Sequence, residues 1–274
     1  MRVYISADIE GIAAVTSREE TGTVGFDFHR ARERMTGEVL AAIAGARANG
    51  ATGFVVSDSH GSGLNLIPER FAEDTELVRS WPRPLGMMQG IESGTFACAF
   101  LLGYHAGAAS PGGTLAHTLS SRGLHALKIN GLDLSEAGLS AAVAGQFGVP
   151  ITLMSGDDVF IAETARLLGG LESVVTKRST GYFSVHSKTP MLVERELRAA
   201  AGAALRRSTD TKPFSPEPPF HAEVTFKAPL AAELFCYLPG FVRVGACGVR
   251  FDAKDAVTLN RIMQFLTTLA PTLG

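Results

Sequence analysis

The chain opens with the stretch RVYISADIEG, residues 2–11, in which residues 2–8 have the character of a buried strand and two acids, Asp8 and Glu10, stand at its end. Successive side chains of a strand point to opposite faces, so Ser6, Asp8 and Glu10 share one face if the extended conformation continues. Gly11 then lets the backbone turn. Ligands of open α/β sheets bind at the carboxyl ends of parallel strands, where these carboxylates would project. Two carboxylates so close together repel each other, which indicates that a cation binds between them. The alternative is that each carboxylate only accepts hydrogen bonds from backbone N–H groups at the turn.

Apolar runs alternate with helical patterns along the rest of the chain. This alternation predicts an α/β fold, with a mainly parallel β-sheet flanked by helices and a smaller C-terminal α/β portion. A hairpin is expected within residues 124–134, turning at Asn130-Gly131. A proline-rich break at residues 209–220 predicts a division into residues 1–212 and 213–274, unless the two form one compact unit. Further strands are expected within residues 53–60, 96–107, 151–158, 173–177, 221–229 and 248–253, and helices within residues 27–48, 135–148, 158–170, 190–208 and 255–270.

The composition of the chain excludes several classes of partner. Lys and Arg number 25 against 27 Asp and Glu, and no basic block stands out, so neither nucleic acid nor an anionic membrane is an expected partner. The longest apolar run, residues 96–104, is too short to span a bilayer, and acids occupy the place of a signal peptide's apolar region. The three scattered cysteines indicate reduced thiols. We therefore expect a cytoplasmic protein.

Three histidines follow apolar runs, at His60 in SDSHG, His105 in GYHAG and His117 in AHT. Mixed sets of imidazole and carboxylate are typical of hydrolytic metal sites, although a single histidine after a strand is more often a hydrogen-bonded loop residue. Glu136 adds a further acid in the first turn of an expected helix, where the helix dipole alone would favour it, and Ser135 is its expected N-cap. In SGDD, Asp157 or Asp158 is expected to cap the next helix.

These motifs together resemble the Ser-x-Asp-x-Glu-Gly signature and the later motifs of the D-aminopeptidase (DppA-like) metallopeptidase family. The match runs in order through SADIEG, SDSHGSGLNLIPE, GYHAG, AHT, NGLDLSEAGL and SGDD, and covers residues 1–180 well. The resemblance implies two zinc ions per chain held by side chains at strand ends. Its metal ligands would be Asp8, Glu10, His60, His105 and Glu136, with Asp8 as the bridge. His117 would be the catalytic histidine, and Asn65 matches a family position without an assigned role.

The resemblance further implies an aminopeptidase that hydrolyses short peptides or amides with an N-terminal D-amino acid. Two adjacent zinc ions lower the pKa of a shared water and polarise the scissile carbonyl, which supplies a nucleophile without serine or cysteine. His117 could protonate the leaving amine or stabilise the oxyanion. Residues 1–212 would then be the metal-binding catalytic domain. The family also implies a ring-like homo-oligomer that admits small peptides.

Two alternatives remain at this point. A haloacid-dehalogenase-type, magnesium-dependent phosphatase also begins with an acid pair after its first strand, and Ser57 and SGDD could fill two of its other roles. It would leave the three histidines without a function. A non-catalytic metal-binding α/β protein is the second alternative, but closed structural zinc sites are usually rich in cysteine, whereas these candidate ligands are histidines and carboxylates.

Overall fold

The structure, a computed structural model, describes residues 1–273. Its larger sheet has seven strands in the order β3-β2-β1-β4-β7-β8-β9, and all neighbours are parallel except β8 and β9. The strands are β1 (Arg2–Ala7), β2 (Gly53–Asp58), β3 (Thr75–Val78), β4 (Cys98–Tyr104), β7 (Ile151–Asp157), β8 (Glu172–Gly181) and β9 (Ser184–Ser187).

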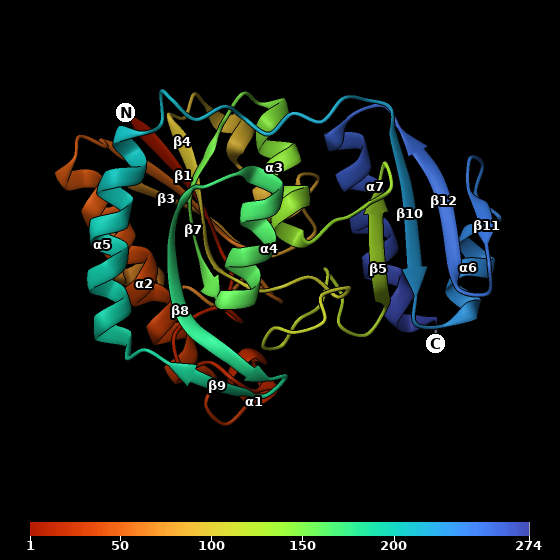
Figure 1. Ribbon diagram of the computed structural model, residues 1–274, viewed down its shortest axis with the longest axis horizontal. Coiled ribbons are helices and arrows are strands. Elements are labelled where there is room, and N and C mark those ends of the chain that lie inside the picture. The colour runs from red at the N-terminus through yellow and green to blue at the C-terminus, as the bar shows by residue number, and fades with distance from the viewer. Residues whose placement is uncertain (274) are drawn as a thin grey trace.

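Helices cover both faces of this sheet (Figure 1). On one face α2 (Phe28–Ala48) packs beside α5 (Pro190–Arg206), and both share a buried apolar cluster with Val3, Ile5 and Ala7 of β1. On the other face Tyr4 joins a second cluster with residues of α3 (Glu136–Gln146) and α4 (Asp158–Leu168). The strands at the centre of the sheet are buried on both faces, which explains why their sequences are almost continuously apolar.

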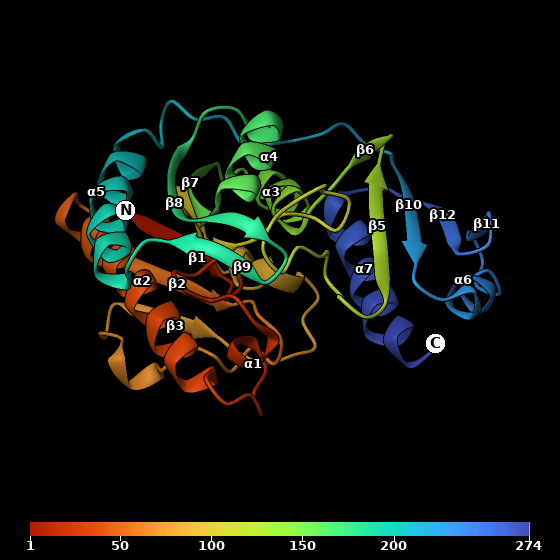
Figure 2. The same cartoon turned by 60° about the horizontal axis from the view of Figure 1, so that its bottom comes forward.

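A second, antiparallel sheet lies beside the first (Figure 2). Its order is β11-β12-β10-β5-β6, so it combines a hairpin from the middle of the chain with C-terminal strands. The division at residue 213 therefore stays a prediction, because this sheet draws strands from both sides of it. Its elements are β5 (Leu124–Ile129), β6 (Leu132–Asp133), β10 (Phe220–Phe226), β11 (Val242–Val244) and β12 (Gly248–Ala253), with α6 (Pro229–Phe235) and α7 (Ala256–Leu269) packed against it.

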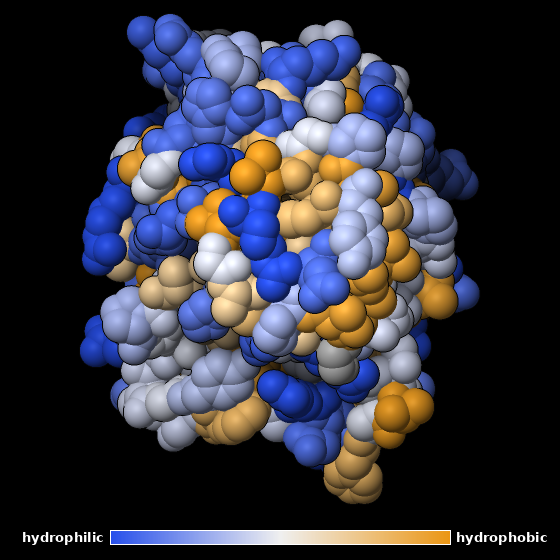
Figure 3. Space-filling model, turned by 90° about the vertical axis from the view of Figure 1, so that its right-hand side faces the viewer, coloured by the Kyte–Doolittle hydropathy of each residue, from blue (hydrophilic) through white to orange (hydrophobic). Residues whose placement is uncertain are grey.

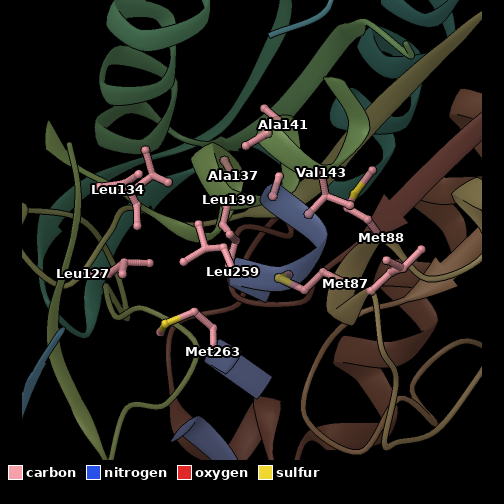
Figure 4. Packing of buried hydrophobic residues seen from close by; sticks show 14 of the residues in the cluster. Met87, Met88, Leu127, Leu134, Ala137, Leu139, Ala141, Val143, Leu259 and Met263 are labelled. Carbon is pink, nitrogen blue, oxygen red and sulfur yellow. The ribbon is translucent and has the colours of Figure 1, made fainter. Parts of the chain in front are cut away.

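Helix α7 joins the two sheets. Its Leu259 and Met263 lie close to Leu139 of α3 and to Met87, within a single apolar cluster that also includes Leu127 of β5 (Figure 4). Burial of apolar side chains on this scale is the main force that holds such layers together. The second sheet thus packs on the first through α7 and α3.

The predicted mainly parallel α/β architecture is confirmed, as is the hairpin at Asn130-Gly131, whose two residues have φ of 51° and 82°. Three short strands, β3, β9 and β11, were not predicted. They have three or four residues each, too few to show an alternating pattern. Within residues 1–273, no helix combines the length and the apolar character needed to cross a membrane.

Candidate metal centre

Three neighbouring strands of the larger sheet end at the same edge. Ala7 of β1 pairs with Asp58 of β2 and with Leu102 of β4, so the residues that follow these strands emerge together. Asp8 and Glu10 follow β1, His60 follows β2, and His105 follows β4. Glu136 is the first residue of α3, and His117 lies in the loop between β4 and β5. Four of the six residues predicted from the sequence thus follow strands that end at this edge, and the N-terminus of α3 and the β4–β5 loop bring the other two beside them.

The six side chains form two adjacent groups, Asp8 with Glu10 and His60, and His105 with His117 and Glu136. In the first group, Nδ1 of His60 lies 3.2 Å from Oδ1 of Asp8 and 3.0 Å from Oε2 of Glu10. In the second, Nε2 of His105 lies 3.5 Å from Oε2 of Glu136.

The carboxylate of Asp8 lies between the two groups. Its Oδ1 faces His60, and its Oδ2 lies 3.5 Å from Nε2 of His105. Asp8 and His105 are each only 2% exposed. A carboxylate that presents one oxygen to each of two donor groups has the arrangement of a bridging ligand in a two-metal site.

Glu10 reaches the site from a turn, not from the strand. The alternation argument assumed an extended chain up to Glu10, but β1 ends at Ala7 and the chain turns at once, with the Ile12 N–H bonded to the Ile9 carbonyl at 3.2 Å. Gly11 makes this turn possible, because a Cβ there would lie 1.9 Å from the Tyr104 carbonyl oxygen of β4. The predicted convergence of Asp8 and Glu10 holds, but the reason for it was wrong.

Each histidine of the cluster donates one ring N–H to a backbone carbonyl. Nε2 of His60 lies 2.8 Å from the Thr21 oxygen, Nδ1 of His105 lies 2.9 Å from the Ala106 oxygen, and Nδ1 of His117 lies 2.9 Å from the Leu115 oxygen. Since a carbonyl only accepts, the proton of each neutral ring is on that nitrogen. In the neutral ring the other nitrogen, which faces the carboxylates, keeps its lone pair, as is typical of histidine ligands to a metal.

The buried carboxylates of the cluster favour the binding of a cation. Burial, and then the neighbouring Glu10, raise the pKa of Asp8 to about 7. Burial would raise the pKa of Glu10 as well, but without a metal the positive charge of a protonated His60 outweighs burial and holds the pKa of Glu10 well below its usual value. Oδ2 of Asp8 and Nε2 of His105 are buried without a hydrogen-bond partner in residues 1–273. Buried polar atoms left unpaired are costly, so these oxygen and nitrogen donors fit a divalent metal.

His117 differs from the other two histidines. Its ring stacks on that of His105, with centroids 4.1 Å apart and planes at 10°, and its Nε2 is 3.8 Å from Oε1 of Glu136. Its side chain is 18% exposed, against 2% for His105. Burial, and then the neighbouring His105, lower the pKa of His117. A neutral imidazole at the open side of the cluster can accept and return a proton.

A buried polar network supports the loop that carries His60. The carboxylate of Asp58 accepts from the Asn65 side-chain amide at 2.6 Å and from the backbone N–H groups of Asn65 and Leu66 at 2.6 and 2.7 Å. The same Asn65 amide donates to the His60 carbonyl at 2.7 Å. Asn65 therefore ties the His60 loop to the end of β2, which gives this position a structural role.

Two ionisable residues that the sequence did not single out for this role hold the turn that carries Glu10. Nζ of Lys177, 1% exposed on β8, donates to the carbonyls of Glu10, Ile12 and Val15. Burial lowers its pKa to about 8. Oε1 of Glu38, on α2, accepts from the Ala13 N–H at 2.8 Å. These partners are more than twenty residues apart in the chain, so no local pattern reveals them.

The acids of SGDD do not join the cluster. Oδ1 of Asp157 accepts from the Phe160 N–H at 2.7 Å and caps α4, as expected, while its Oδ2 accepts from the Thr114 N–H. Asp158 accepts from the Ser179 N–H at 2.8 Å. Both carboxylates thus serve backbone groups, which removes the late acid pair that the phosphatase alternative needs.

A cavity of about 1140 Å³ opens onto the cluster. Asp8, Glu10, His60, His117 and Glu136 are among the residues that line it. Its other walls come from the loops after β1, β2, β3 and β4, from the β8–β9 hairpin through Tyr182, and from the C-terminal half of α7. The second sheet and its helix therefore help to build the space in which a substrate would lie.

Histidines and carboxylates gathered at the carboxyl ends of parallel strands, beside a large cavity, define the class: a metal-dependent hydrolase built on a parallel sheet. A family model for the D-aminopeptidases, peptidase family M55, matches residues 1–265. The chain is also 30% identical over 271 residues to a D-aminopeptidase of Bacillus subtilis (strain 168), covering 98% of each chain.

Among solved structures, the Zn-dependent D-aminopeptidase DppA from Bacillus subtilis, described as a self-compartmentalizing protease, superposes with a TM-score of 0.93 at 30% identity, covering 98% of both chains. This chain therefore belongs to the M55 D-aminopeptidase family and is a peptidase. The comparisons do not favour the phosphatase or the non-catalytic alternative.

Proposed function

We propose that this chain is a zinc-dependent aminopeptidase that removes an N-terminal D-amino acid from short peptides or amides. One observation carries the proposal: the two oxygens of the buried Asp8 face two separate groups of histidine and carboxylate, at 3.2 Å from His60 and 3.5 Å from His105. Two ions would be held by Asp8, Glu10 and His60 on one side and by Asp8, His105 and Glu136 on the other.

Zinc is the metal that the donor set favours. Imidazole nitrogen and carboxylate oxygen suit zinc in hydrolytic sites, whereas magnesium prefers oxygen donors alone. The structural relative at 30% identity is named as Zn-dependent. When bound, such a metal pair supplies an activated water and polarises the scissile carbonyl.

The residues of the chain orient the metal ligands and transfer a proton. His60 and His105 are oriented by the Thr21 and Ala106 carbonyls, which fixes the nitrogens turned toward the carboxylates. His117 would move the proton: its Nε2 faces the cluster, and a lowered pKa keeps it neutral, so that it can accept a proton from the attacking water and then pass it to the leaving amine nitrogen. Preference for a D-residue rests on the family relationship, since chirality depends on the shape of the cavity.

A ring-like homo-oligomer is part of the proposal, because the structural relative is described as self-compartmentalizing. The surface supports it. Figure 3 shows apolar patches between polar residues on the face that carries the second sheet. Tyr237 and Val242 in this portion are 72% and 54% exposed, and Val24 and Phe26 after α1 (Arg18–Thr21) are 99% and 91% exposed. Contacts between subunits would bury such side chains. A cytoplasmic location is also proposed, in keeping with three free cysteines.

Metal analysis beside an amidase assay on D-Ala and L-Ala p-nitroanilides tests the proposal. We expect about two zinc ions per chain, as in two-metal hydrolases, and faster hydrolysis of the D-substrate. The variant Asp8→Ala should lose zinc, and an unchanged zinc content would remove Asp8 as the bridge. Zinc-loaded protein that hydrolyses neither substrate would contradict the proposal, as would magnesium with phosphatase activity.

A further inference from the structure

The cavity beside the metal centre carries two positive charges that the proposed chemistry does not use. Arg18 and Arg122 are among the residues that line it, and both are exposed. Neither side chain has a hydrogen bond or ion pair with any described residue. Other arginines of the chain do have such partners: Arg34 pairs with Glu20 at 3.1 Å and Arg47 with Asp74 at 2.8 Å. Arg18 and Arg122 are therefore free to meet a ligand.

Within residues 1–273, the negative charges of the cavity belong to the proposed metal ligands alone. The carboxylates that line it, within the part of the chain described, are Asp8, Glu10 and Glu136, the three proposed metal ligands. A bound metal pair neutralises much of that charge. The remaining charged groups of the lining, apart from histidines, are the two guanidinium groups. One cavity thus brings together the proposed metal ligands and two arginines.

The loop that carries Arg122 is held in place. The Leu119 N–H in the same loop donates to Oε1 of Glu136 at 2.5 Å, and the Gly123 N–H donates to the Ser120 hydroxyl at 3.0 Å. Nζ of Lys227 donates to the Ser121 carbonyl at 2.6 Å and adds a further positive charge beside the loop. The backbone of Arg122 is therefore fixed relative to the metal centre, which lowers the entropic cost of using its side chain.

We propose that Arg18 and Arg122 bind the C-terminal carboxylate of the substrate and select short peptides with a free carboxylate over peptides that lack one. This inference rests on the proposed aminopeptidase function and names the substrate class of the same site. A guanidinium presents two parallel N–H donors to a carboxylate, and such charge-assisted pairs are stronger than neutral hydrogen bonds. A short peptide whose scissile bond lies at the metals would extend its other end along these walls.

The test compares D-Ala-Gly with D-Ala-Gly amide, which have the same scissile bond and differ only in the terminal charge. We expect the wild-type protein to prefer the free acid in kcat/KM by roughly 10-fold or more, the scale of charged hydrogen bonds. The Arg18→Ala/Arg122→Ala variant should bring this ratio close to one, through KM and not kcat, since it removes binding that ground state and transition state share. Arg122→Lys should keep part of the preference. Arg250→Ala, an exposed arginine of β12, is the matched control and should leave the ratio unchanged.

Two readouts separate this inference from the proposed function. Hydrolysis of D-Ala p-nitroanilide by the double variant shows that its metal centre is intact. Calorimetric titration of zinc-loaded His117→Ala protein with the same two peptides reports the preference in Kd without turnover. Failure of wild-type, zinc-loaded protein to hydrolyse any of these substrates would contradict the proposed function. The ratio of the two Kd values from calorimetry would still test the role of the arginines. Equal affinity for acid and amide, or a preference for the acid that survives in the double variant, would overturn the proposal that Arg18 and Arg122 bind the carboxylate.

Discussion

Replacing Asn65 by alanine tests whether the polar network behind His60 holds the metal centre together. Asn65→Ala removes the amide that donates to Asp58 at 2.6 Å and to the His60 carbonyl at 2.7 Å. A buried hydrogen bond to a charged group contributes about 1.5–3 kcal/mol and a neutral one about 1 kcal/mol, so we expect the free energy of unfolding to fall by about 3 kcal/mol. Because the His60 loop loses its tie to β2, zinc affinity should fall roughly 10- to 100-fold, the usual cost of losing a residue that orients a ligand.

Urea denaturation of zinc-free protein measures the first effect, and zinc titration against a competing chelator measures the second. The matched control is Asn260→Ala, which removes another buried asparagine, on α7, whose amide donates to the Pro84 carbonyl at 3.1 Å. The control should cost about 1 kcal/mol and leave zinc affinity unchanged. Wild-type zinc affinity in Asn65→Ala, or an equal loss in Asn260→Ala, would refute the reasoning.

Three further substitutions separate catalysis, pH dependence and support. His117→Ala should lower kcat by about 10²- to 10⁴-fold while zinc content stays at the wild-type level, as metal analysis and steady-state kinetics can show; loss of a zinc ion would make His117 a ligand. Burial raises the pKa of Glu38 to about 8, so its contribution to stability is full below pH ~4.5 and is lost as pH rises to about 8. The unfolding free energy of the wild type minus that of Glu38→Gln should therefore fall between pH 5 and about pH 8 in urea titrations, and a constant difference would contradict this cause. Lys177→Met should lower the unfolding free energy by about 3 kcal/mol, because three carbonyls lose a charged donor, and a loss below about 1 kcal/mol would show that water replaces it.

The sequence predicted the elements whose patterns are long and local. Residues 2–8 and 27–48 were expected as a strand and a helix, and the structure has β1 at Arg2–Ala7 and α2 at Phe28–Ala48. The two-sheet arrangement could not be read in the same way. β5 pairs with β10, which lies almost a hundred residues further along the chain, and no local pattern encodes such pairing.

The candidate site shows the same limit. The six residues that the sequence singled out lie together: strand-end positions pointed to Asp8, His60 and His105, while the order of the motifs added the others, including Glu10, which comes from a turn. The groups that hold them were missed because their partners are distant in the chain: Lys177 bonds the carbonyls after β1, and Arg83 bonds the Asp58 carbonyl at 2.9 Å. A lysine in a strand or an arginine in a loop reads as a surface residue until the fold shows what it touches.

The number of zinc ions bound per chain tests the central claim most directly. Protein purified without chelators, dialysed against zinc and then against zinc-free buffer, can be measured by inductively coupled plasma mass spectrometry. The arrangement of Asp8 between two groups of histidine and carboxylate predicts about two zinc ions per chain. One zinc ion or none would contradict a two-metal centre bridged by Asp8.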